Sequence, residues 1–369
     1  MIETGSFLDS IVIREYQTKD KHWLSKIYYS IRRSMTQNGF IWVAEDQSNQ
    51  TVVGGICVSE KLLKINGKER IFFYPFDACV DPKYRACKVL KRLSDRATDV
   101  YMQHSEMGPI IYTSTACTNG AMGTFYKDSV MQTMAQQVQH AWHVKNPVTN
   151  INYPNDKRIR IWKERNPDIV KAKFSIAFQN YEMVPVDFDD LILNRFWKYS
   201  YFAQYKVNDT LYEASISIWD QNKVCKLINL AQPNSKRQQK NDESFSRLSG
   251  NFFQLFGCYS TEKDNDYLFT ELLKYVHNDC FEMGIEYLFA GFAKTDPAEK
   301  YFPLLPGLKS LKFQLMFCIG SEEEKKLLEI KNRPFFQDPR DYGILLLYQD
   351  EPIAIGNNPN DTQSLIAKL

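Results

Sequence analysis

The sequence lacks the features that mark several large classes of protein. No run approaches the roughly 20 consecutive apolar residues of a membrane-spanning helix. Residues 1–15 carry acidic side chains where a targeting peptide would be basic. Lysine plus arginine (46) and aspartate plus glutamate (44) leave a net charge of only +2, which excludes a chain-wide grip on nucleic acid. We therefore expect a cytoplasmic protein with neither a membrane nor a nucleic-acid partner.

Cysteine and glycine motifs are missing as well. Eight cysteines are scattered along the 369 residues without a Cys-x-x-Cys pair, and most stand in apolar runs typical of buried, reduced thiols. Neither Gly-x-Gly-x-x-Gly nor Gly-x-x-x-x-Gly-Lys-Ser/Thr occurs, which excludes the usual dinucleotide and P-loop motifs. His140 and His143 have no cysteine or acid at ligand spacing nearby, so we expect no bound metal.

What the chain does have is ample material for a core, with 44% hydrophobic and 14% aromatic residues. Its length suits two domains. Prolines, asparagines and charged residues cluster over 145–165, which makes this range the best candidate for a boundary. We therefore predict one domain over residues 1–160 and a second over residues 161–369.

Local patterns predict strands and helices in both halves. Asn66-Gly67 between apolar runs predicts a β-hairpin, and Asp81-Pro82 ends its second strand. The predicted strands cover 11–16, 40–45, 51–59, 62–65, 70–80, 110–116, 211–219, 223–230, 252–259 and 287–293, and the predicted helices cover 22–33, 87–103, 120–128 and 266–283. A hairpin before the long helix favours an α+β fold, a mostly antiparallel mixed sheet flanked by helices, over a doubly wound fold.

The most informative stretch is 74–93, in which a buried strand stops at Asp81-Pro82 and a turn leads directly into a helix. The first N–H groups of a helix lack intrahelical acceptors and lie at its positive end, so they can hold phosphate. Basic side chains surround this turn, namely Lys83, Arg85, Lys88, Lys91 and Arg92. A basic helix start is also commonly just a solvated face, so this stretch alone leaves both interpretations open.

Here the sequence resembles the GNAT acyltransferase superfamily, whose acyl-coenzyme A site combines a strand, a Val-x-Pro-x-Tyr-Arg-Gly-x-Gly-x-Gly-like turn and a helix. Val80-Asp-Pro-Lys-Tyr-Arg85 matches that turn. Asn119, with Tyr126 seven positions later, is similar to the second signature of the family. The hairpin over 63–71 and the segment Ala214-Ser-Ile-Ser-Ile-Trp-Asp-Gln221 look like the tandem-GNAT subfamily. The resemblance therefore covers nearly the whole chain and implies two tandem GNAT-like domains.

The resemblance implies transfer of an acetyl or larger acyl group from acetyl-coenzyme A, a co-substrate, to an unidentified amine by direct attack in a ternary complex. It implies that Tyr126 is the acid for the departing thiolate, and we expect Asp77 to be the base. Coenzyme contacts are implied for Cys79, Val80, Arg85, Ala86, Cys87, Lys88, Val89, Leu90 and Asn119. Plainer interpretations stand beside these, because a tyrosine on a short helix more often packs than catalyses, and Asp77 could pair with an arginine.

The departures from the family pattern matter as much as the matches. Where the family turn has glycines, this chain has Ala86, Lys88 and Leu90, whose Cβ atoms stand where backbone approaches phosphate. Lys88 could supply an ammonium contact in place of an N–H group. In the second half, acidic residues over 260–266 stand where a pyrophosphate would lie, so a second site is not expected there.

Two functions from different classes remain open. The first is an N-acyltransferase with one working site in the N-terminal half, which the joint survival of four site positions favours. The alternative is a catalytically degenerate GNAT-fold protein that serves as a structural or interaction subunit with protein partners. The lost glycines and the content of 24 Phe and 21 Tyr favour this alternative. Binding of coenzyme A separates the two.

Overall fold

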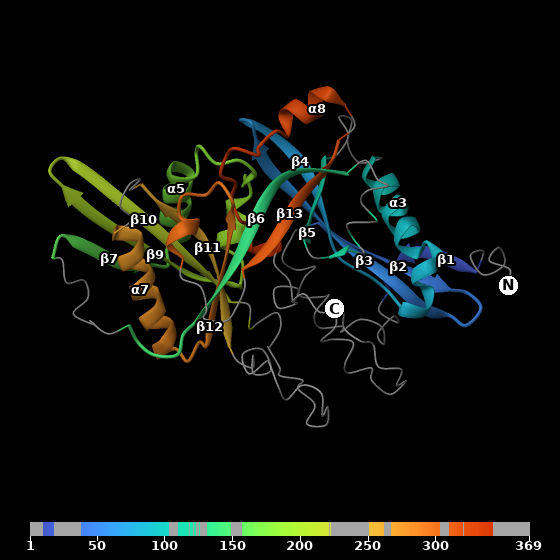
Figure 1. Ribbon diagram of the computed structural model, residues 1–369, viewed down its shortest axis with the longest axis horizontal. Coiled ribbons are helices and arrows are strands. Elements are labelled where there is room, and N and C mark those ends of the chain that lie inside the picture. Colours follow the sequence, from blue (N-terminus) through green and yellow to red (C-terminus); the bar gives the residue numbers. More distant parts are fainter. Residues whose placement is uncertain are drawn as a thin grey trace.

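In the computed structural model, one large sheet carries helices packed against it (Figure 1). The structure describes residues 10–17, 38–102, 110–117, 119, 120, 122, 125, 131–148, 157–220, 222, 251–261, 267–302, 310–319 and 321–341. The strands are β1 (Ile11–Glu15), β2 (Gly39–Asp46), β3 (Thr51–Ile65), β4 (Lys68–Val80), β5 (Ile110–Ala116), β6 (Met131–His143), β7 (Ile159–Glu164), β8 (Val184–Pro185), β9 (Trp197–Val207), β10 (Thr210–Trp219), β11 (Phe252–Ser260), β12 (Tyr287–Ala293) and β13 (Leu311–Cys318). The helices are η1 (Pro82–Cys87), α3 (Val89–Met102), α5 (Pro167–Ala177), α6 (Phe188–Ile192), α7 (Tyr267–Glu282), η3 (Glu299–Tyr301), α8 (Glu322–Leu327) and η4 (Pro339–Asp341).

The strand order is β1-β2-β3-β4-β5-β13-β6-β12-β11-β10-β9-β7, with β8 paired to β3. Two pairs, β4–β5 and β11–β12, are parallel, and the other described pairs are antiparallel. Each parallel pair is joined by a long helix, α3 in one case and α7 in the other. The predicted mostly antiparallel mixed sheet flanked by helices is therefore confirmed.

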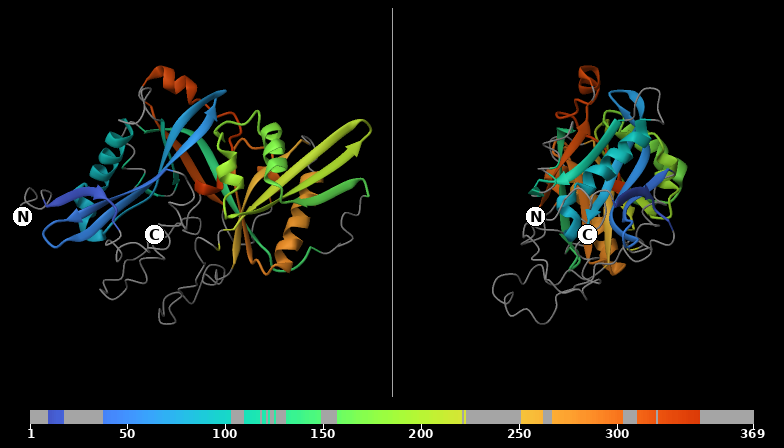
Figure 2. Two further views of the ribbon diagram at one scale, coloured as in Figure 1. Left: turned by 180° about the vertical axis from the view of Figure 1, so that it is seen from behind. Right: turned by 90° about the vertical axis from the view of Figure 1, so that its right-hand side faces the viewer.

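The two ends of the sheet have the same arrangement. Four antiparallel strands, β1–β4 at one end and β7, β9, β10 and β11 at the other, lead to a parallel neighbour, β5 or β12. In the middle, β13 lies between β5 and β6, while β6 lies between β13 and β12. Figure 2 shows this twisted sheet with α3 toward one end and α7 toward the other. Segments from both halves of the chain are thereby joined in one ladder.

A β-bulge interrupts β4 toward one end of the sheet and β11 toward the other. Opposite β3, the register of β4 shifts around Asp77, and opposite β10 the register of β11 shifts around Gly257. Both residues have left-handed backbone, with φ of 51° at Asp77 and 58° at Gly257. A bulge inserts one extra residue and reverses which face the following side chains occupy. Phe76 and Cys79, three positions apart, accordingly pack into the same apolar cluster.

Local turn chemistry was predicted correctly. Asn66 and Gly67 have φ of 47° and 73°, and two positive φ values are what a type I′ hairpin turn requires. Before this turn, β3 is a single 15-residue strand, whereas the pattern predicted two strands over 51–59 and 62–65. The predicted strands 110–116 and 287–293 are found with those bounds. The long helices appear as α3 and α7, close to their predicted ranges.

Other predictions were wrong or fall elsewhere. The composition of 145–165 predicted loop, whereas β7 lies inside this range as a strand paired with β9. β6, β9 and β13 were not predicted. The predicted helix 22–33, the strand 223–230 and most of the helix 120–128 lie outside the described residues. No helix among the described ranges is long and apolar enough to cross a membrane.

Alternation places different chemistry on the two faces of the sheet around β4 and β5. Phe73 and Ile111 pack with α3, through Val89 and Leu93. Their neighbours Phe72, Tyr74, Ile110 and Tyr112 pack on the opposite face with Leu315 and Phe317 of β13. The start of α3 and the residues around Tyr74 and Tyr112 therefore lie on opposite sides of the same pair of strands.

Candidate functional site

The β4 and β5 strands part soon after they meet. Their parallel ladder is confined to Phe72 with Ile110 and Phe73 with Ile111. Beyond these pairs, two side chains of β5 bridge the strands. The hydroxyls of Tyr74 and Ser114 are 2.9 Å apart, and the Thr113 hydroxyl donates to the Pro75 carbonyl over 3.0 Å. The C-terminal part of β4 thus pairs with β3, whereas β5 pairs with β13.

Asp77, the predicted base, lies on this C-terminal part of β4 at the bulge. Its side chain is half-buried, and its backbone is left-handed. A non-glycine residue in this conformation costs about 1 to 2 kcal/mol, so surrounding contacts must hold it there. The structure places Asp77 on the part of β4 beyond its pairing with β5, and its catalytic role stays a prediction.

Cys79 and Val80 end the strand opposite Gly55 and Gly54. The Cys79 thiol approaches the Gly55 carbonyl at 3.9 Å, and both side chains are half-buried. A Cβ atom on Gly54 would lie only 2.9 Å from Cγ1 of Val89, so the glycine allows α3 to pack this close to β3. The first residue of α3 is thereby held beside the end of β4.

The predicted phosphate turn is a 3₁₀ helix, η1, capped by Asp81, whose carboxylate accepts from the Lys83 N–H over 2.9 Å. The Arg85 guanidinium donates to the Val80 carbonyl over 3.3 Å and is exposed. Ala86 and Cys87 complete η1. The turn therefore brings the backbone of the predicted contact residues to one place, at the end of β4.

Lys88 joins η1 to α3 with left-handed backbone, φ 52°, and an exposed side chain. Glycine is the residue that adopts this conformation without strain, so the chain keeps a glycine-type turn with a lysine in it. Val89 is buried under the sheet and Leu90 is half-buried. Of these positions, the exposed cations Arg85 and Lys88 stand at the positive end of α3.

Asn119 follows β5 and is exposed, and its side-chain oxygen accepts from the Met122 N–H over 3.2 Å. The proposed pantetheine contact is thus near a strand end, but its carbonyl oxygen has a local partner. Tyr126, the predicted acid, lies outside the described residues. Its position relative to Asp77 is therefore left as a prediction.

The histidines that were set aside as metal ligands do not face one site. Three positions apart on β6, His140 and His143 point to opposite faces of the strand. His140 is buried and contacts Glu299 at 2.8 Å and Ser310 at 3.0 Å. Within the residues described, no cluster of three or more His, Cys, Asp or Glu side chains is placed to hold a metal ion.

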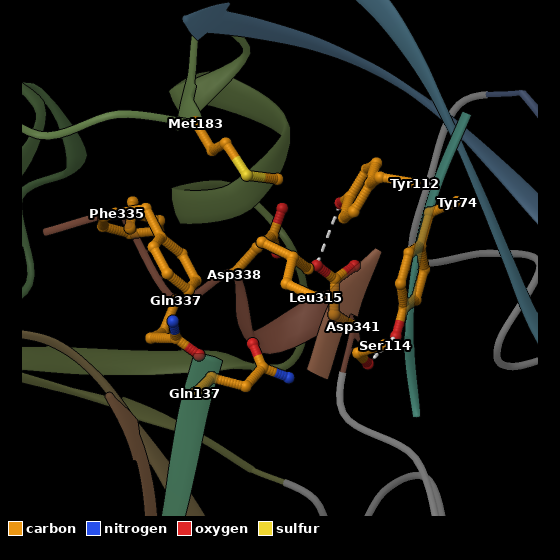
Figure 3. Close-up of a pocket in the computed structure, with 11 residues that line it drawn as sticks. Tyr74, Tyr112, Ser114, Gln137, Met183, Leu315, Phe335, Gln337, Asp338 and Asp341 are labelled. Carbon is orange, nitrogen blue, oxygen red and sulfur yellow. Dashed lines mark hydrogen bonds between the residues drawn. The ribbon is translucent and has the colours of Figure 1, made fainter. Parts of the chain in front are cut away.

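A small cavity of about 20 Å³ lies on the face opposite α3, next to the point where β4 and β5 part (Figure 3). Its walls come from β4, β5, β6, β13, the residue before β8 and the segment after α8, namely Tyr74, Tyr112, Ser114, Gln137, Met183, Leu315, Phe335, Phe336, Gln337, Asp338 and Asp341. Aromatic rings and two carboxylates dominate this lining. Of these residues, only Tyr74 belongs to the stretch 74–93 that the sequence analysis singled out.

The carboxylates belong to a buried charge network. The Lys61 ammonium, fully buried on β3, contacts Asp338 at 3.2 Å and also pairs with Asp341. Tyr112 donates to Asp341 over 3.0 Å. On the same segment, the Arg340 guanidinium holds Asp338 at 2.8 Å and Asp187 at 2.7 Å. Charges that are this deeply buried must be paired to be tolerated.

The two cavity carboxylates differ in acidity. Burial by itself would raise the pKa of Asp338, but the nearby Arg340 and Lys61 cations lower it below its usual range. Burial raises the pKa of Asp341 against the attraction of Lys61, and the negative charge of Asp338 raises it further. Burial, with the charges of Asp341 and Asp338, raises the pKa of Tyr112. One carboxylate is therefore locked in its ionised form, and its neighbour takes up a proton more readily.

At the other end of the sheet, the equivalent bulge is covered. A Cβ atom on Gly257 would lie 2.5 Å from Cζ of Phe174, a fully buried ring of α5. That ring makes edge contacts with Phe178, Phe256 and Phe336. The bulge of β11 is thus covered by an aromatic cluster.

A solved structure shares this arrangement of elements. A GCN5-related N-acetyltransferase from Sphaerobacter thermophilus matches 84% of this chain and 95% of its own chain, with a TM-score of 0.55 at 9% identity. The chain has the GNAT fold. This agrees with the fold that the turn at Val80–Arg85 implied.

Two further solved structures align less well. A probable N-acyltransferase from Enterococcus faecalis V583 and a GCN5-related N-acetyltransferase from Anabaena variabilis ATCC 29413 both have a TM-score of 0.47 and 10% identity. Each match covers 83% of this chain, and 71% and 72% of the other chains respectively. No protein-family model matches the sequence, and no curated protein matches it.

Proposed function

We propose that this GNAT-fold protein is an acyl-coenzyme A-dependent N-acyltransferase, which transfers an acetyl or larger acyl group to an amine by direct attack. The observation that carries the proposal is the parting of β4 from β5 beside the bulge at Asp77. Next to it, a cationic turn leads into α3. We expect a thioester arm to lie where these strands part, while its phosphates meet the positive end of the helix.

The proposed roles follow this placement. Arg85 and Lys88, with the backbone of Ala86, Cys87, Val89 and Leu90, would hold the pyrophosphate. The ends of β4 at Cys79 and Val80, with Asn119, would hold the pantetheine arm and the carbonyl. Tyr126 would protonate the departing thiolate, and Asp77 would assist deprotonation of the amine.

The chain would form two tandem GNAT-like domains, residues 1–160 and 161–369, of which only the first has a working site. The repeated strand order and the repeated bulge support two related units. The aromatic ring of Phe174 over Gly257 supports a single site, because it fills the space beside the second bulge. In this division β6 belongs to the first domain but pairs with β12 of the second, and β13 belongs to the second domain but pairs with β5 of the first. Both strands would therefore join the two domains into one sheet.

Calorimetric titration with acetyl-coenzyme A tests the proposal. We expect micromolar binding that Arg85→Glu and Lys88→Glu each weaken about tenfold or more, because both remove a charge-assisted contact to phosphate. Lys331→Glu is the matched control. It makes the same change of charge at an exposed lysine after α8 that pairs with Glu329.

A wild-type protein that shows no binding up to millimolar ligand contradicts the proposal. That result would favour the second function, a degenerate subunit of a larger assembly, for which the Cβ atoms of Ala86, Lys88 and Leu90 in the turn already argue. Equal weakening by Lys331→Glu would show that binding depends only on net charge and not on the turn.

A further inference from the structure

The turn that leads into α3 has no glycine to relieve its backbone. Lys88 has left-handed backbone, φ 52°, a conformation that strains every residue with a Cβ atom. Strained backbone persists only where the surrounding structure holds it. The contacts that hold this turn therefore decide where Arg85 and Lys88 place their charges.

The start of the turn is attached to the strands beside it. Asp81 caps η1, and its N–H donates to the Val53 carbonyl of β3 over 2.9 Å. The Arg85 guanidinium donates back to the Val80 carbonyl, five positions earlier. These bonds fix where η1 begins. The orientation of the rest of the turn, toward Lys88, depends on contacts further along.

A side-chain bond ties the middle of η1 to the turn between β2 and β3. The Tyr84 hydroxyl donates to Oδ2 of Asp46, the last residue of β2, over 3.0 Å and across 38 positions of the chain. The Tyr84 ring is half-buried and packs against the apolar cluster that contains Val53 and Val89. Tyr84 therefore connects η1 both to the core beneath α3 and to Asp46.

Asp46 is a firm anchor for this bond. It is only 1% exposed, and its Oδ1 accepts from the N–H and the hydroxyl of Ser48 at 3.0 Å and 2.7 Å. Its Oδ2 also accepts from the Asn49 amide over 3.3 Å. The Ser48 hydroxyl above all, with the Ser48 N–H and the Tyr84 hydroxyl, lowers the pKa of Asp46 against the effect of burial. The carboxylate is therefore ionised at neutral pH, and its bond to Tyr84 is charge-assisted.

We propose that the bond between Asp46 and Tyr84 positions the cationic turn, so that Arg85 and Lys88 face the phosphates of acyl-coenzyme A without the glycines of the family pattern. The inference rests on the proposed function and names two positioning residues for its coenzyme site. Tyr84 acts through Arg85, its neighbour in η1, and Asp46 acts through Tyr84. Without this bond the turn would take several orientations, and coenzyme binding would have to order it.

Tyr84→Phe tests the bond while keeping the ring. Calorimetric titration with acetyl-coenzyme A should give a Kd about fivefold or more above the wild-type value. Tyr199→Phe is the matched control, because it removes a hydroxyl that donates to the Asp279 carboxylate over 3.2 Å toward the other end of the sheet. The control should leave the Kd within about twofold of the wild type. An unchanged Kd in Tyr84→Phe, or equal weakening in Tyr199→Phe, would overturn the proposal.

A double-mutant cycle separates positioning from a general loss of stability. If Tyr84 acts through Arg85, Tyr84→Phe should weaken binding only about twofold in an Arg85→Gln background, compared with about fivefold in the original protein. A loss of folded protein would weaken binding by the same factor in both backgrounds. Equal factors would therefore overturn the positioning role.

Asp46→Asn reaches the same bond from its other side and decides the question if Tyr84→Phe does not fold. It keeps an acceptor for the Tyr84 hydroxyl but removes the charge, so the Kd should rise about twofold to fivefold. An unchanged Kd would overturn the role of Asp46. Wild-type binding of acetyl-coenzyme A that neither variant weakens sinks this inference alone, whereas the absence of wild-type binding sinks the proposed function and this inference with it.

Discussion

Replacing Gly257 with alanine should destabilise the protein by about 2 to 5 kcal/mol. Two structural costs add here. Left-handed backbone costs an alanine about 1 to 2 kcal/mol, and overpacking a filled core costs about 1 to 3 kcal/mol. Both apply, because Gly257 has φ +58° and its added Cβ would meet Cζ of Phe174 at 2.5 Å. The Phe174 ring is enclosed by Phe178, Phe256 and Phe336 and has little room to move away.

Gly67→Ala separates the two costs. Gly67 also has positive φ, +73°, but nothing lies within 4 Å of an added Cβ atom. It should therefore lose only the backbone contribution, about 1 to 2 kcal/mol. The free energy of unfolding in urea, followed by tryptophan fluorescence, gives both values on one scale.

The difference in unfolding free energy between the two variants measures how tightly Phe174 packs against the bulge at Gly257. A Phe174→Leu background should shrink the effect of Gly257→Ala toward that of Gly67→Ala, because the smaller side chain leaves space for the Cβ atom. If Gly257→Ala and Gly67→Ala agree within about 0.5 kcal/mol in the original protein, the bulge is not covered as described. The structural argument for a single site would then fail.

Three further predictions concern the charge network and the thiols. Lys61→Met should cost about 3 to 5 kcal/mol of unfolding free energy, because it removes the cation of Asp341 and leaves Asp338 with Arg340 alone. Lys91→Met at the exposed Lys91–Asp95 pair should cost under about 1 kcal/mol. The pKa of Asp338 is lower in the folded than in the unfolded protein, so its ionised form stabilises the fold above the ordinary aspartate pKa. This stability is lost as the pH falls toward the folded-state pKa. The free energy of unfolding in urea should therefore fall less between about pH 5 and 2 in Asp338→Asn than in the wild type. Among the described cysteines Cys117 alone is exposed, so maleimide should label it before the buried Cys57, Cys258 or Cys280. The labelling rate should keep rising above pH 9, because partial burial raises the pKa of the Cys117 thiol. Earlier labelling of a buried thiol, detected by peptide mass spectrometry, would contradict this prediction.

Several elements could be predicted because their signals are local. The Asn66-Gly67 turn depends on two residues that tolerate positive φ, and α3 shows its apolar face within one helix. β6 shows the opposite case, since its sequence is rich in glutamine. Gln139 is nonetheless buried and bonds Gln254 of β11 at 3.0 Å, so a polar residue fills an inward position with a partner that the pattern cannot reveal.

The candidate site divides along the same line. The cationic turn before α3 was readable, because Pro82, Arg85 and Lys88 are close together in the chain. The left-handed backbone of Asp77 could not be predicted from the sequence, because a bulge depends on pairing with the partner strand and an aspartate alone does not indicate one. The charge of Asp338, Arg340 and Asp341 was visible as a run, but nothing in the run indicated burial.

By itself, the sequence determined where β1 to β5, β10 to β12 and the long helices α3 and α7 form, and how the hairpin turns, because these depend on neighbours within a few positions. Only the tertiary structure decided that β13 lies between β5 and β6, and that Lys61 meets Asp341, 280 positions away. Strand pairing over such separations is selected by the burial of whole faces and by the pairing of buried charges. Both are properties of the assembled sheet and of no single segment.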